Sequence, residues 1–98
     1  SPRMTDDTAS FELPKIMKVE DGETLHGFLA SAQSKHIAFD CSSVERLSGL
    51  SAQMLVMAAS VWRSQSLDVT FTGPSDGFVQ SVAILGLNDL LLPPQVAA

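Results

Sequence analysis

Residues 36–64 of the chain read HIAFDCSSVERLSGLSAQMLVMAASVWRS, and this stretch decides the fold. It opens with a short continuous apolar run at residues 37–39, which is the pattern of a strand covered on both faces. A polar loop follows, and apolar residues then recur at helical spacing from about Gly49 to Ser64. The residues predicted to form the buried face of this helix are Leu50, Met54, Met57, Ala58 and Val61.

Helical patterns also flank this stretch on both sides. A helix is predicted from about Gly22 to Ser34, with apolar positions at Leu25, Phe28, Leu29 and Ala32. A third helix is predicted after the sequence GPSD at residues 73–76, where Ser75 can cap the free amide groups and Gly86 later breaks the helix. The apolar positions of the third helix are Phe78, Val79, Val82 and Leu85.

Strand patterns alternate with these helices. Leu67, Val69 and Phe71 alternate with polar residues, which predicts a strand with one polar face, nearer an edge of the sheet. A weaker strand is predicted from Ile16 to Val19. Strands and helices in alternating order build a parallel sheet through right-handed crossovers, so the predicted fold class is α/β.

Length and composition bound the organisation of the chain. Its 98 residues suffice for one domain, and 45% hydrophobic with 17% charged residues is typical of a globular protein. The polar start of the chain predicts a disordered N-terminal segment at residues 1–9, in which Ser1, Pro2 and Arg3 are left from cloning and Met4 is the native start. The domain is then expected to span residues 10–98.

Charge and cysteine usage limit the partners. Six Lys and Arg residues oppose eleven Asp and Glu residues, which gives a net charge of -5. The six cations are scattered, whereas nucleic acids and anionic membranes attract clustered positive charge, so a protein partner is favoured. The single cysteine, Cys41, is interpreted as a buried, inert thiol. Neither a signal peptide nor a membrane span is evident in the sequence, so the cytoplasm is the expected compartment.

The sequence offers few candidates for catalysis. His26 and His36 stand without a metal-binding motif, and no phosphate-binding glycine loop is present, so neither a metal nor another cofactor is predicted. Ser42 and Ser43 follow a strand but lack the Gly-x-Ser-x-Gly elbow of hydrolases. Trp62, at the edge of the apolar stripe with Met54 and Met57, indicates core packing or an adhesive surface. The chain is therefore predicted not to be an enzyme.

Two interpretations fit the sequence SGLS at residues 48–51. In the structural interpretation, Ser48 caps the following helix and Gly49 lets the chain turn into it. In the functional interpretation, Ser48 is a switch, because a phosphate at the positive end of a helix would add charge that repels or recruits a partner.

Several short motifs in order resemble the STAS (sulphate transporter and anti-sigma antagonist) domain from about Ile16 to Leu92. They are FDCSSV at residues 39–44, SGL at 48–50 opening a helix, LDVTF at 67–71 leading to Pro74 and Ser75, and LGL at 85–87. The resemblance implies a mixed, mostly parallel sheet of about four strands with three to four helices on one side. It also implies a bacterial regulatory protein that binds a partner through the loop before the second helix.

Site residues follow from the same resemblance. The implied partner-binding residues are Glu45, Arg46, Leu47, Ser48, Gly49 and Leu50. The family motif Asp-Ser-Ser-Gly-Leu, whose first serine is phosphorylated in anti-sigma factor antagonists, is incomplete here, because the loop is about two residues shorter. Ser48 is the first candidate for phosphorylation and Ser51 the second.

Three functions compete on this basis. The first is a signalling domain that binds a kinase-like or chemotaxis partner, as anti-sigma factor antagonists do. The second is the STAS subunit of a phospholipid-transporting ABC system, which docks on the cytoplasmic ATPase. The third is a small hydrolase that uses Ser42, Ser43 or Ser48.

Overall fold

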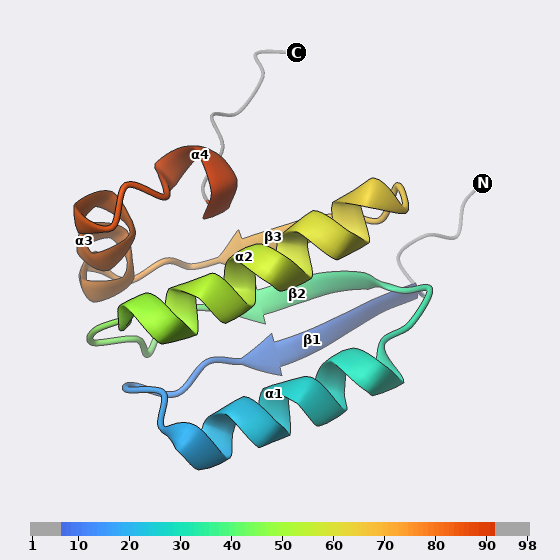
Figure 1. Cartoon of the computed structure of the whole chain (residues 1–98), viewed down its shortest axis with the longest axis horizontal. Helices are drawn as coiled ribbons and strands as arrows, with labels where there is room; N and C mark the ends of the chain where they lie inside the picture. Colours follow the sequence, from blue (N-terminus) through green and yellow to red (C-terminus); the bar gives the residue numbers. More distant parts are fainter. Residues whose placement is uncertain (1–6, 92–98) are drawn as a thin grey trace.

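The computed structural model describes residues 7–91, in which strands and helices alternate along the chain (Figure 1). The elements are β1 (Thr8–Glu12), α1 (Val19–Ser31), β2 (His36–Asp40), α2 (Gly49–Ser64), β3 (Val69–Thr72), α3 (Asp76–Ile84) and α4 (Asn88–Leu91). The sheet has the order β1-β2-β3, and both pairs of strands are parallel. The predicted α/β class is confirmed. Within residues 7–91 the sheet has three parallel strands, in place of the expected mixed sheet of about four.

The first strand is not where the sequence pattern placed it. The predicted strand from Ile16 to Val19 is wrong, because these residues form a loop and Val19 begins α1. Instead, Thr8 and Ala9, which were assigned to the tail, are the first two residues of β1. The ring of Phe11 lies 4.9 Å from that of Phe28 in α1, so packing against the helix holds this polar strand in the sheet.

The alternation of buried and exposed residues shows that the helices cover one face of the sheet. Ile37 and Phe39 are buried in the core, whereas Thr70 and Thr72 on the other face are exposed. Ala38 is only half-buried, so the prediction that residues 37–39 are covered on both faces is wrong. In the core, stacked aromatic rings connect β2, β3 and α3, with centroid distances of 5.3 Å for Phe39–Phe71 and 5.8 Å for Phe71–Phe78.

The helix α2 has the predicted bounds but is rotated relative to the prediction. Leu50, Met57 and Val61 were expected in the core, yet they are 75%, 66% and 47% exposed. Most of the residues that are buried instead are small, and small side chains allow the helix to lie close to the sheet. The buried residues of α2 are Ser51, Ala52, Leu55, Ala58, Ala59 and Trp62.

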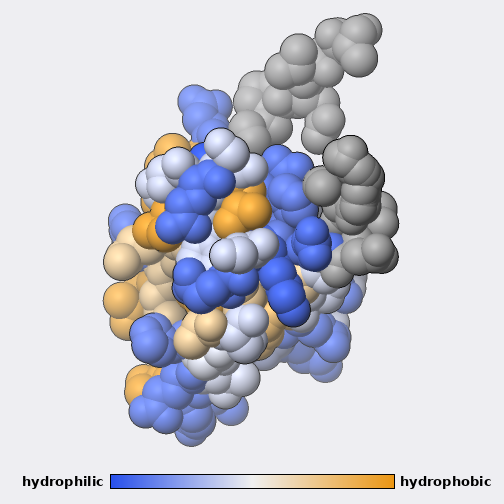
Figure 2. Space-filling view, turned by 90° about the vertical axis from the view of Figure 1, so that its right-hand side faces the viewer, coloured by the Kyte–Doolittle hydropathy of each residue, from blue (hydrophilic) through white to orange (hydrophobic). Residues whose placement is uncertain are grey.

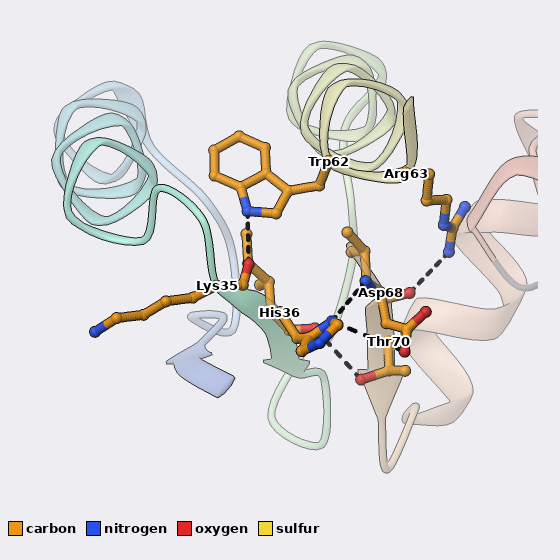
Figure 3. A network of polar contacts seen from close by, with 8 residues as sticks. Lys35, His36, Trp62, Arg63, Asp68 and Thr70 are labelled. Atoms are coloured by element: carbon orange, nitrogen blue, oxygen red, sulfur yellow. Dashed lines mark hydrogen bonds and ion pairs between the residues drawn. The ribbon is translucent and has the colours of Figure 1, made fainter. Parts of the chain in front are cut away.

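Trp62 and its neighbours fasten α2 to the beginning of the sheet (Figure 3). Trp62 is only 5% exposed, and its indole N–H donates a hydrogen bond of 2.9 Å to the carbonyl oxygen of Lys35. Arg63 donates to the carbonyl oxygens of Val69 at 2.8 Å and Leu90 at 2.7 Å. These bonds join α2 to the chain before β2, to β3 and to α4.

The other two predicted helices are confirmed with shifted ends. The first begins at Val19, three residues earlier than expected, and buries Leu25. In α3, the Ser75 hydroxyl accepts a hydrogen bond of 3.1 Å from the amide of Phe78, and Gly86 follows with a φ of 72°. These are the predicted cap and helix break.

Candidate functional site

The candidate site is the loop between β2 and α2, at the end of the molecule where the parallel strands finish. It comprises residues 41–48 and the first turn of α2, and α3 begins beside it. The carboxyl ends of parallel strands are a common place for binding sites, because the loops there converge. The opposite end of the molecule, where the strands begin, is mostly hydrophilic (Figure 2).

Asp40 fixes the start of the loop. Its carboxylate accepts hydrogen bonds from the backbone amide of Ser42 at 3.0 Å and from the Ser42 hydroxyl at 2.7 Å. These two bonds stabilise the charged form and hold the pKa of Asp40 below its ordinary value. The Ser42 hydroxyl is thereby occupied as a donor in a local turn.

The middle of the loop is bound to α3. Val44 and Leu47 are buried, at 3% and 5% exposure, and anchor the loop in the core. The amide of Leu47 donates a hydrogen bond of 3.0 Å to the buried hydroxyl of Ser81, and the Ser75 hydroxyl donates to the carbonyl oxygen of Val44. Two serines of α3 thus pair with backbone groups of the loop.

Gly77 permits the close approach of α3 to the loop. A Cβ atom at this position would overlap the carbonyl oxygen of Glu45 and would lie 2.9 Å from that of Val44. On the other side of the loop, the amide of Glu45 donates a hydrogen bond of 2.9 Å to the carbonyl oxygen of Lys15. The loop is therefore held from both sides by backbone contacts, which makes it a rigid platform for the start of α2.

Ser48 caps α2 as the structural interpretation predicts. Its hydroxyl oxygen accepts a hydrogen bond of 3.2 Å from the amide of Ser51, and the two hydroxyl oxygens lie 3.1 Å apart. Ser48 is exposed, whereas Ser51, the second candidate for phosphorylation, is only 6% exposed. Of the two, Ser48 is therefore the accessible hydroxyl.

The six predicted partner-binding residues divide into an exposed set and one anchor. Leu47 is buried, so its side chain supports the loop rather than facing solvent. The exposed members are Glu45, Arg46, Ser48, Gly49 and Leu50. We call residues 45–50 the contact segment.

Two apolar residues of α3 that the sequence pattern did not assign to the site lie next to the contact segment. Ile84 is 84% exposed and lines a hollow of about 400 Å³ together with Glu45 and Arg46. The side chain of Leu85 approaches Gly49, where an added Cβ would lie 3.9 Å from its Cδ2. Leu85 was predicted as a core residue but is 38% exposed. An isoleucine outside the predicted apolar stripe was the available signal.

The alternative chemistries find little support in the geometry. Between residues 7 and 91, no three His, Cys, Asp or Glu side chains gather closely enough to hold a metal ion. His36 begins β2 and Ser42 follows its end, so about 20 Å of strand separates them at roughly 3.3 Å per residue. His36 Nδ1 instead accepts a hydrogen bond of 2.9 Å from the amide of Asp68. None of the helices in this part of the chain is both long and apolar enough to cross a membrane.

Cys41 should be unreactive in the folded protein. Burial, and secondarily the charge of Asp40, raises the pKa of its thiol from 9.0 to about 12. Because the unfolded thiol ionises first, stability should fall as the pH rises from about 9 toward 12. At pH 8, alkylation by iodoacetamide should be about 100-fold slower than in a denaturing urea concentration. Equal rates would contradict the burial, and Cys41→Ala should show the smaller loss of stability at high pH.

One comparison with known proteins gave a match. A family model described as "Mlab, STAS domain" matches residues 4–93 of the chain. The match includes the whole contact segment and extends further toward the N-terminus than the resemblance in the sequence motifs. No curated protein and no solved structure matches the chain.

Proposed function

This chain belongs to the STAS domain family, and we propose that it is a regulatory domain that acts by binding a protein partner through the contact segment. The observation that carries the proposal is the rigid support of this segment. Its backbone is bonded to α3 and to Lys15, yet Leu50 at its end is 75% exposed. A large apolar side chain on a rigid base is typical of an interface residue, because little conformational entropy is lost on binding.

The surroundings of Leu50 support the same proposal. Ile84 and Leu85 add exposed apolar surface, while Glu45 and Arg46 contribute charges of both signs. An apolar centre with a charged rim is the usual composition of a protein–protein interface. STAS domains are in general non-enzymatic binding domains, and we propose that this chain likewise has no catalytic activity.

The partner that we place first is a cytoplasmic bacterial signalling protein of the kinase-like or chemotaxis type. This choice extends the resemblance to anti-sigma factor antagonists, in which the equivalent loop is the contact surface. Ser48 lies at the exposed start of α2, where an added phosphate would meet the positive end of the helix.

A second candidate partner is the ATPase of a phospholipid-transporting ABC system. The shortened loop favours it, because the chain lacks the acidic residue and the first serine of the antagonist motif. STAS subunits of transporters bind their partners without an established need for phosphoserine. In this case Ser48 would serve as a helix cap and contact residue only.

Affinity capture with purified variants tests the proposal. Leu50→Glu places a charge at the centre of the contact segment and should weaken partner capture from cells of the native organism by about tenfold or more. Val19→Glu is the matched control, since Val19 is 86% exposed in the first turn of α1, remote in sequence from the contact segment. The identity of the captured protein separates a signalling kinase from a transporter ATPase. Equal capture by both variants and the wild type would reject the contact segment.

Substitutions of Ser48 separate the cap from the switch. Ser48→Ala removes the acceptor for the Ser51 amide and should lower the free energy of unfolding by about 0.5–2 kcal/mol in chemical denaturation. Ser48→Asp retains a cap and should leave stability nearly unchanged, but it should weaken or redirect partner binding through its charge. If the wild type and both variants bind the partner equally, Ser48 acts only as a cap.

A further inference from the structure

A second apolar surface lies between α1 and α2. A groove of about 200 Å³ opens there, and its lining is almost wholly apolar. It shares no lining residue with the contact segment or with the hollow beside it. The principal apolar residues of the groove are Leu25, Leu29, Met54, Met57, Val61 and Trp62.

The exposure of the groove is a consequence of the rotation of α2. Leu55 and Trp62 face the sheet, so Met57 and Val61 remain on the outer surface at 66% and 47% exposure. These two residues stand four positions apart, one helical turn, and Met54 lies on the same side. Methionines in an open groove adapt their shape to an incoming apolar surface. The groove therefore has the form of a docking site for apolar side chains spaced by a helical turn.

The walls of the groove determine the secondary structure of what binds there. Both walls are helices, whose interior N–H and C=O groups are bonded within the helix. An extended segment would bring its own unpaired backbone groups against an apolar surface without a partner, which is costly. A helix satisfies its backbone internally and exposes only side chains. The groove consequently fits a helix that presents an apolar face.

The charges around the groove determine the sign of the partner's charge. α1 carries Glu20, Asp21 and Glu23 and no Lys or Arg, and α2 has no charged residue before Arg63. Among the helices of residues 7–91, Arg63 is the one Lys or Arg residue, and its guanidinium already bonds two backbone carbonyls. A second copy of the chain therefore offers no free cationic helix. We propose that the α1–α2 groove binds an amphipathic helix of another protein whose apolar face is flanked by Lys and Arg.

Fluorescence of Trp62, the single tryptophan of the chain, reports directly on the groove. The probe is a synthetic tryptophan-free peptide of about 18 residues, roughly five helical turns, with Leu at helical spacing and Lys on the flanks. We expect a saturable spectral change with this peptide. Binding should be about tenfold weaker when Glu replaces Lys, and when two central residues are replaced with Pro.

A matched pair of protein variants distinguishes the groove from general attraction to an acidic protein. Val61→Lys and Leu90→Lys add the same charge at residues that are 47% and 49% exposed, but only Val61 lines the groove. The lysine peptide should bind Val61→Lys about tenfold more weakly and Leu90→Lys as it binds the wild type. Equal binding by the two variants, equal binding of the Glu peptide, or no saturable change would overturn the proposal. A dimer of the chain alone that Val61→Lys abolishes would also overturn it, in favour of a second copy.

Discussion

Replacing Gly77 with alanine should lower the free energy of unfolding by about 2 kcal/mol or more, the range of severe overpacking. The new Cβ would overlap the carbonyl oxygen of Glu45 and would lie 2.6 Å from its carbonyl carbon. These atoms belong to the backbone of the contact segment, so they cannot move aside as the end of a flexible side chain could. Either α3 or the loop must shift, and the Leu47–Ser81 hydrogen bond would be strained with it. Urea denaturation measures the loss.

Gly27 supplies the matched control, because it also lies within a helix but has open space around it. No atom lies within 4 Å of a Cβ placed at Gly27 in α1. Gly27→Ala should therefore raise stability by about 0.5–1 kcal/mol through helix propensity and reduced entropy of the unfolded chain. The same substitution should thus have opposite signs at the two sites. A stabilising Gly77→Ala would show that α3 does not press on the contact segment.

Replacing Trp62 with alanine should cost about 3–5 kcal/mol of unfolding free energy, as large-to-small changes in a core do. Trp62 is 5% exposed, and its removal leaves a cavity beneath α2. It also leaves the carbonyl oxygen of Lys35 without its indole partner. Because the substitution removes the fluorophore, circular dichroism should follow the unfolding.

Met57→Ala is the control for Trp62→Ala on the same helix. Met57 is 66% exposed, so its truncation should change stability by only about 0.5 kcal/mol, as surface substitutions usually do. The two substitutions together determine which face of α2 contacts the sheet. A larger loss from Met57→Ala than from Trp62→Ala would restore the face that the apolar pattern predicted.

The sequence predicted the order and type of most elements because caps and periodicity act locally. Ser48 and Ser75 cap their helices as expected, and Gly86 ends α3 with a positive φ. The face of α2 was not predictable in this way, because apolar residues occur all around that helix. Favouring the larger side chains selected Leu50 and Met57, whereas close packing on the sheet selected the small ones.

The first strand and part of the site depended on contacts that are distant in the sequence. β1 is a polar strand, and its register is set by pairing with β2 and by the packing of Phe11 on Phe28. The position of the contact segment was predictable from the motif at residues 48–50. Its support by Gly77 and its extension by Ile84 and Leu85 were not, because they arise where α3 folds back against the loop.

The order of the strands has a consequence for synthesis on the ribosome. β1 pairs with β2 and β2 with β3, so no later strand has to enter between two earlier ones. A nascent chain can therefore close its first strand–helix–strand unit before α2 has emerged. The backbone of the contact segment, however, finds its partners Ser75 and Ser81 only when α3 has been made. An incomplete chain can thus fold its first strands while the surface that we propose for binding is still unformed, which delays partner capture until synthesis is nearly finished.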